Sequence, residues 1–220
     1  VMSVANGSAT GGTSGGIIGK AYDGNNYNKA SNTTIIIDNC KNTVNLTAGG
    51  HTGGMIGLVK SSMLKLTNCS IESCEINIEG NYYYCGGVSG MVAAAWCDVI
   101  TVENCNAKEV NINSRGTSSY GATGGMLGAV FGNGDYNSKC EKITIKNCNI
   151  TDANFNSKKD VAGIVGFVES KNIEVDSCNV INTEIVNESD SGNTASYNAS
   201  GIVAYVSGAS EKTSVKNCKV

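Results

Sequence analysis

The sequence predicts an all-β protein: a right-handed parallel β-helix of about six coils, each of about 37 residues with three short strands. Three observations predict this fold. A glycine signature recurs along the chain, a short alternating run ending in Asn-Cys recurs between its copies, and the composition favours strands and turns. With 28 glycines, no proline and 16% charged residues, the chain resembles neither a coiled coil nor collagen.

The glycine signature, Gly-Gly-aliphatic-aliphatic-Gly in its clearest copies, is the first predicted strand of each coil. Its second glycine falls at positions 16, 54, 87, 125, 163 and 201, with successive spacings of 38, 33, 38, 38 and 38 residues. Chance does not hold such a register, so the signature indicates a structural repeat. Its last glycine forms a further column, which indicates a cramped interior or a bend: Gly19, Gly57, Gly90, Gly128 and Gly166.

The second signature is a short strand that ends in Asn-Cys. Apolar and polar residues alternate before the dipeptide, as in Ile143-Thr144-Ile145-Lys146, and this pattern is typical of a strand with one buried face. The asparagine is predicted to form a corner, because asparagine accepts left-handed backbone conformations and stacked asparagines hydrogen-bond along a column. The predicted corner residues are Asn39, Asn68, Asn104, Asn147 and Asn217, with Ser177 in the remaining copy.

A third short alternating segment completes each coil and is clearest at Val110-Asn111-Ile112 and Ala153-Asn154-Phe155. Strands this short bury too little to be stable alone, whereas stacked repeats bury one continuous apolar column. Each strand is therefore expected to pair in parallel with its equivalent one coil away, at about 4.8 Å. Crossovers between parallel strands are right-handed, and this sets the predicted hand.

Six of the ten cysteines follow the corner residues and are predicted to point inward as reduced, structural side chains. They are Cys40, Cys69, Cys105, Cys148, Cys178 and Cys218. As catalytic thiols each would need a basic partner, and His51 is the only histidine. The close Cys or Cys/His pairs of a zinc site are missing, so no metal site and no cofactor is predicted.

The other four cysteines suggest two disulfides as hypotheses. Cys97 and Cys140 each precede their corner cysteine by eight residues in adjacent units, which would place them one coil apart. Cys74 and Cys85 flank one loop and form the second candidate pair. Free thiols at all four positions are the alternative.

Tyrosines gather in the loops that lead into the glycine signature, and they are the predicted ligand-binding residues. They are Tyr82, Tyr83, Tyr84, Tyr120 and Tyr197. Because these loops are equivalent in successive coils, the rings are expected along one side of the rod, where an aromatic face can stack on a sugar. The alternative is that they cover the core beneath long loops.

Charge and hydropathy exclude further function classes. The chain has 16 basic residues, of which one is arginine, and 19 acidic residues, so no basic surface for nucleic acid is expected. No apolar run is long enough to span a membrane. The chain starts at Val1 and stops within a repeat, so residues 1–220 are interpreted as one repeat segment of a longer chain, whose open ends could associate end to end.

The two signatures, from Gly15 to Cys218, resemble the GLUG-type repeat of bacterial surface proteins. They are also similar to the Gly-Gly-x-x-Gly repeats of polymorphic outer-membrane adhesins. The resemblance implies a β-helical stalk or passenger segment on a cell surface, used for adhesion. Cysteine at the corner departs from the serine or threonine usual in these families, and the repeat carries no catalytic residues.

The sequence therefore predicts a non-enzymatic, extracellular or cell-surface adhesin stalk that presents loops to a host protein or glycan. Two alternatives remain. One is a structural repeat protein that assembles into filaments through its ends. The other is a polysaccharide lyase or glycosidase on a β-helix, which would need charged residues converging from adjacent coils.

Overall fold

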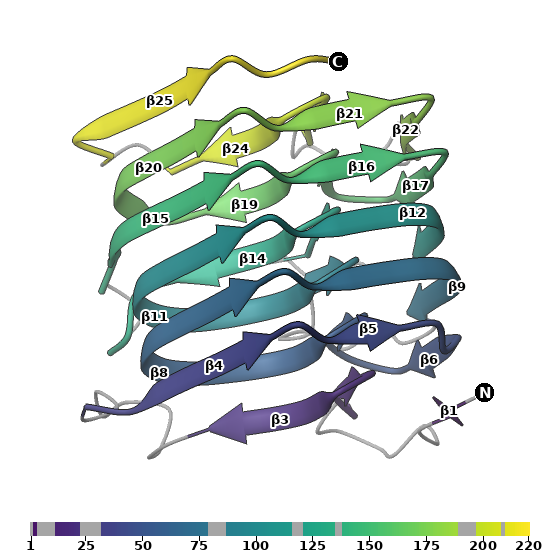
Figure 1. Cartoon of the computed structure of the whole chain (residues 1–220), viewed down its shortest axis with the longest axis horizontal. Helices are drawn as coiled ribbons and strands as arrows, with labels where there is room; N and C mark the ends of the chain where they lie inside the picture. The colour runs from purple at the N-terminus through teal and green to yellow at the C-terminus, as the bar shows by residue number, and fades with distance from the viewer. Residues whose placement is uncertain are drawn as a thin grey trace.

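The computed structural model describes residues 2–3, 12–22, 32–78, 87–115, 121–134, 138–188, 197–207 and 210–220. Within these residues the protein is all-β with no helix, as predicted. The strands form three sheets in which all pairings are parallel. Figure 1 shows the repeats stacked from the N-terminal end at the bottom to the C-terminal end at the top.

Each sheet collects equivalent strands from successive repeats. Sheet I contains β2 (Ser14–Gly15), β7 (Thr52–Gly53), β10 (Gly87–Ser89), β13 (Ala122–Gly124), β18 (Asp160–Ala162) and β23 (Ala199–Ser200). Sheet II contains β3 (Ile18–Tyr22), β4 (Thr34–Asp38), β8 (Ile56–Thr67), β11 (Val92–Glu103), β14 (Leu127–Phe131), β15 (Cys140–Lys146), β19 (Val165–Val168), β20 (Ser170–Asp176), β24 (Val203–Val206) and β25 (Lys212–Lys216). Sheet III contains β1 (Met2–Ser3), β5 (Lys41–Asn42), β6 (Leu46–Ala48), β9 (Ser70–Ile78), β12 (Asn106–Ser114), β16 (Asn149–Thr151), β17 (Asn154–Ser157), β21 (Asn179–Ile181) and β22 (Glu184–Asn187).

The chain visits the sheets in the order I, II, III in each repeat and then returns to sheet I. Sheet II is strongly curled, because β8 and β11 continue as single strands around a bend that separates two strands in the other repeats (Figure 1). In these two repeats no loop separates the strand that follows the glycine signature from the Asn-Cys strand. The stacked parallel sheets are compatible with a solenoid.

Inward-pointing side chains form continuous apolar columns. Leu64, Ile100, Ile143 and Ile173 lie in register on β8, β11, β15 and β20, and all four are buried. The next inward position, two residues along each strand, repeats the pattern with Leu66, Val102, Ile145 and Val175. Alternation in the sequence therefore predicts correctly which residues make the core of sheet II.

The glycine signature lies at a corner between sheets I and II rather than within one strand. Gly53 ends β7 and Ile56 begins β8. The backbones of successive repeats touch here: a Cβ on Gly54 would lie 2.0 Å from the carbonyl oxygen of Gly90, and one on Gly90 would lie 2.3 Å from that of Gly125. Glycine recurs at this corner because no side chain fits between the stacked backbones.

The predicted alignment of the third glycine copy is wrong. Gly54 is followed along the stack by Gly90, because the Gly54 amide donates to the Ser89 carbonyl at 3.1 Å and the Gly90 amide donates to the Gly124 carbonyl at 3.2 Å. Gly87 instead pairs with Ala122 in sheet I. The motif Gly86–Gly90 resembles the signature, but the hydrogen-bond register places its last glycine where the other copies have their second.

A second left-handed corner, within sheet III, was not predicted. Its residues have φ between 49° and 54° and differ in type: Ser73, Glu109, Asp152 and Asn182. Glu109 accepts a hydrogen bond from Ser73 Oγ at 2.7 Å, and Asp152 accepts one from Asn182 Nδ2 at 3.2 Å. Because this corner repeats a backbone conformation but not a residue, the sequence shows no motif there.

Candidate functional site

The predicted asparagine corner is present in all six copies. We define the corner ladder as Asn39, Asn68, Asn104, Asn147, Ser177 and Asn217. All six residues have left-handed backbones, with φ between 52° and 56°. The amide groups hydrogen-bond along the stack: Asn147 Nδ2 donates to Asn104 Oδ1 at 3.3 Å, and Asn104 Nδ2 donates to Asn68 Oδ1 at 3.4 Å.

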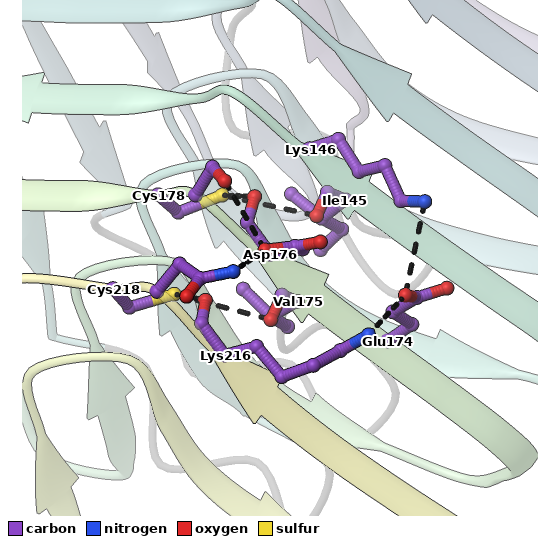
Figure 2. A network of polar contacts seen from close by, with 10 residues as sticks. Ile145, Lys146, Glu174, Val175, Asp176, Cys178, Lys216 and Cys218 are labelled. Atoms are coloured by element: carbon purple, nitrogen blue, oxygen red, sulfur yellow. Dashed lines mark hydrogen bonds and ion pairs between the residues drawn. The ribbon is translucent and has the colours of Figure 1, made fainter.

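Aspartate replaces the asparagine acceptor at two steps of the corner ladder. Asn68 Nδ2 donates to Asp38 Oδ1 at 3.1 Å. At the other end, Asn217 Nδ2 donates to Asp176 Oδ1 at 2.8 Å and Ser177 Oγ donates to the same atom at 3.1 Å (Figure 2). The hydrogen bond from Asn217 is the main cause that lowers the pKa of Asp176 below its usual value. Asp176 thus takes the place of the missing amide next to Ser177.

Replacing Asn147 by alanine is expected to lower the free energy of unfolding by about 1–2 kcal/mol, because alanine is strained in a left-handed conformation. Asn147→Gly is the matched control: it also loses the amide contact, yet it has no such strain and should lower the free energy of unfolding by less. Urea denaturation measures both. Equal losses in the two variants would contradict a role for the left-handed corner.

The six corner cysteines lie in one column beside the ladder. Cys69, Cys105, Cys148 and Cys178 are buried, whereas Cys40 and Cys218 at the two ends of the column are partly exposed. Every thiol of this column donates to the carbonyl two residues earlier, at 3.1–3.4 Å. Figure 2 shows the last two members, whose sulfurs also approach Ile145 O and Val175 O of the preceding repeat.

Neighbouring thiols in this column affect one another's ionisation. The nearby thiols of Cys148 and Cys69 lower the pKa of Cys105, and Cys105 in turn raises the pKa of both neighbours. Cys105 is nevertheless fully buried. A thiol of lowered pKa reacts as a nucleophile only where a substrate can reach it, so the column serves as packing within the core.

The first hypothetical disulfide, between Cys97 and Cys140, is not present. Cys97 and Cys140 are both free and buried, and their sulfurs have different partners. Cys97 Sγ lies 3.4 Å from Ser61 Oγ, and Cys140 Sγ donates to the Asp98 carbonyl at 3.3 Å. Burial is the main cause that raises the pKa of Cys97 to about 11 and that of Cys140 to about 12.

Only one of the two cysteines of the second hypothetical disulfide lies within the described residues. Cys74 is a free thiol that points into the core from β9, and burial raises its pKa to about 11. Its intended partner, Cys85, lies outside the described residues. Cys74 is thus an inward-facing residue in the middle of β9, whereas the spacing suggested a residue beside a loop.

Of the five predicted ligand-binding tyrosines, the structure describes only Tyr197. Tyr82, Tyr83, Tyr84 and Tyr120 lie outside the described residues. The Tyr197 hydroxyl accepts a hydrogen bond from Lys159 Nζ, which also lies 4.0 Å from the centre of the tyrosine ring. Lys159 is itself buried. Tyr197 therefore packs against the protein, and the lysine ammonium group already covers one face of its ring.

The structure reveals a row of aromatic side chains on the outer face of sheet II that the sequence analysis missed. Trp96 and Phe131 are 4.9 Å apart and stacked, Phe131 and Phe167 are 5.5 Å apart, and Phe167 and Tyr205 are 5.4 Å apart and stacked. Since the rings mainly face one another, they offer a sugar few free ring faces. The signal that could have revealed the row was an aromatic residue four or six positions after the corner glycines Gly90, Gly125, Gly163 and Gly201.

His51 is buried next to this row. Its Nδ1 accepts a hydrogen bond from the Gly87 amide at 3.2 Å, and its ring meets the Trp96 ring edge-on at 5.9 Å. Burial, with a smaller contribution from the charge of Lys20, lowers the pKa of His51 to about 4. The histidine is therefore neutral at pH 7 and acts as a packed hydrogen-bond acceptor.

Further amide ladders reinforce the outer face of sheet III. Asn149 bridges Asn106 and Asn179, with N–O distances of 2.9 and 2.8 Å. Asn113 likewise bridges Asn77 and Asn156, at 3.0 and 3.3 Å. Each step joins one repeat to the next, so the stack is held together by side chains as well as by backbone pairing.

A groove of about 320 Å³ lies on the outer face of sheet II over β15, β20 and β25. Its polar lining consists of Lys142, Asn172, Glu174, Lys212, Ser214 and Lys216. Figure 2 shows Lys146 and Lys216 converging on Glu174, with Nζ–Oε1 distances of 3.7 and 2.9 Å. This groove brings charged side chains from three successive repeats together.

Comparison of the chain with protein-family models, curated proteins and solved structures gave no match. Within the described residues, no three or more His, Cys, Asp or Glu side chains are arranged to hold a metal ion. The same part of the chain has no helix long and apolar enough to cross a membrane.

Proposed function

We propose that the chain is a segment of a right-handed parallel β-helix that serves as a non-enzymatic adhesin stalk, secreted or on a cell surface. Its variable connections would be presented to a host protein or glycan. The observation that carries this proposal is that one corner of the stack keeps a constant length in successive repeats, whereas other connections vary in length. A constant stack with variable connections is the general plan of proteins that bind through loops on a rigid scaffold.

The corner between sheets II and III has constant length. It consists of two residues in every copy from β8 onward: 68–69, 104–105, 147–148, 177–178 and 217–218. The corner between sheets III and I, in contrast, varies in length. It is shortest at residues 158–159 and longer at residues 79–86 and 188–198. Insertions therefore accumulate at this corner and at the bend within sheet II, where residues 23–33, 132–139 and 207–211 separate the two strands of a repeat.

The stack between these connections has the properties of a stalk. Its core is continuous from Ile37 to Val180, and amide ladders join the repeats along the outer face of sheet III. Because each repeat contacts its neighbours in the same way, the length of such a protein can grow without a change of fold.

Shortening two connections tests the proposal. Residues 79–86 and 188–198 would each be cut to two residues, the length found naturally at 158–159. The intact chain is expected to bind ligands on a glycan array or on host cells, and the shortened variants should lose that binding. Their thermal unfolding midpoint should stay close to that of the intact chain, since the strands are unchanged.

A polysaccharide-degradation screen is the counter-test. Release of reducing or unsaturated ends by the intact chain would show an enzyme and overturn the proposal. Binding that survives both deletions would place recognition on the strands rather than on these connections. Filaments that form through the ends of the chain would favour the structural alternative.

A further inference from the structure

The groove over β15, β20 and β25 contains two lysines whose charge is not neutralised locally. Lys142, Asn172 and Lys212 lie in register across the three strands. Both lysines are exposed, and neither makes an ion pair in the described part of the chain. Two strand spacings separate them by roughly 10 Å.

The acidic groups around the groove already have partners. Glu174 lies between Lys216 and Lys146, and its hydrogen bond with Lys216 is the main cause that lowers its pKa (Figure 2). Glu141 pairs with Lys171 at 2.8 Å, and Asp176 accepts hydrogen bonds at the corner ladder. Two positive charges therefore remain in the groove although the chain as a whole carries −3.

Polar uncharged groups lie between the two lysines. Asn172, the residue between them, donates one amide hydrogen to the Glu141 carbonyl at 3.3 Å and retains its carbonyl oxygen as an acceptor. The Ser214 hydroxyl supplies both a donor and an acceptor to the groove lining. The groove volume of about 320 Å³ lies at the lower end of the range of small-ligand sites.

We propose that this groove binds an acidic oligosaccharide, with its carboxylate or sulfate groups on Lys142 and Lys212 and its hydroxyls on Asn172 and Ser214. This inference rests on the proposed adhesin function and names the class of glycan. The two strand spacings between the lysines suit acidic groups on alternate sugars of an extended chain. Nucleic acid fits less well, since no arginine and no aromatic ring lines the groove.

The test is calorimetric titration of the intact chain with a sulfated, uronic-acid-containing tetrasaccharide and, separately, with a neutral tetrasaccharide. The acidic probe should bind more tightly, and its affinity should fall as salt is raised. The double variant Lys142→Gln and Lys212→Gln should weaken its binding about tenfold or more. The matched control, Lys41→Gln and Lys108→Gln, removes the same charge from sheet III and should keep wild-type affinity.

The outcomes separate this inference from the proposed function. Equal losses in the groove and control variants would overturn the inference, because binding would then follow net charge. Tighter binding of an oligonucleotide of equal charge would overturn it as well. Binding of neutral glycans or host proteins without any acidic glycan would overturn the inference alone. Failure to bind any glycan or host protein would overturn both. Unchanged thermal midpoints show that the variants are folded.

Discussion

Replacing Gly125 by alanine is expected to lower the free energy of unfolding by about 3 kcal/mol or more. The added Cβ would lie 2.1 Å from the carbonyl oxygen of Gly163 in the next repeat and 2.5 Å from Cδ1 of Ile150. The isoleucine side chain can move, but the carbonyl belongs to a backbone held by the Gly125 amide at 3.0 Å. Relief therefore requires the two repeats to separate locally.

Thermal unfolding followed by circular dichroism measures this effect. For a chain of this length, a loss of 3 kcal/mol corresponds to a midpoint lower by about 6–12 °C. Gly19→Ala is the matched control, because a Cβ on Gly19 would meet only the Thr13 carbonyl oxygen, at an ordinary 3.5 Å. Its midpoint should change little. If Gly125→Ala melted like the intact chain, the close approach of backbones at this corner would be wrong.

Acid is expected to destabilise the protein through His51 before its carboxylates are protonated. The folded state keeps His51 neutral down to a pKa of about 4, whereas the unfolded chain binds the proton near 6.5. The unfolded state then binds more protons between these values, so stability falls as pH falls through this window. The full shift corresponds to about 3 kcal/mol lost by pH 4. Urea denaturation at a series of pH values from 7 to 4 measures it.

His51→Asn is the control for this pH dependence. Asparagine can still accept the Gly87 amide hydrogen bond but does not titrate, so the variant should be less stable overall and show a smaller loss between pH 6.5 and 4. Glu169, whose pKa is raised by burial, acts in the opposite direction in both proteins and cancels from the comparison. Equal pH slopes in the two proteins would show that His51 is not the responsible group.

The sequence predicted the strands of sheets II and III better than the corner that joins sheets I and II. Alternation around Ile143 and Ile145 and the left-handed preference of Asn147 are local properties, and the structure has the predicted conformation at both places. The placement of Gly90 failed because Gly87 and Gly90, three residues apart, both fit the second-glycine position of the motif. Only the hydrogen bonds of Gly54 and Gly90 to neighbouring repeats distinguish them.

The candidate site was less predictable than the fold. The groove joins Lys142 and Lys212, which are 70 residues apart in the chain and belong to strands whose connections differ in length. The aromatic row likewise joins Trp96 and Phe131 through their register in sheet II. Neither cluster follows a fixed sequence spacing, so neither appears as a motif. The free thiols of Cys97 and Cys140 depend on the direction of each side chain, which spacing does not contain.

The sequence by itself determined the all-β class, the repeating unit, the inward face of each Asn-Cys strand and the left-handed asparagine corner. These follow from the alternation of apolar residues and from backbone preferences, which act within a few residues. The tertiary structure alone decided the register between repeats, the thiol partners, the buried neutral His51 and the lysine groove. These depend on which backbones hydrogen-bond across repeats, and parallel pairing brings together residues whose separation varies with each connection.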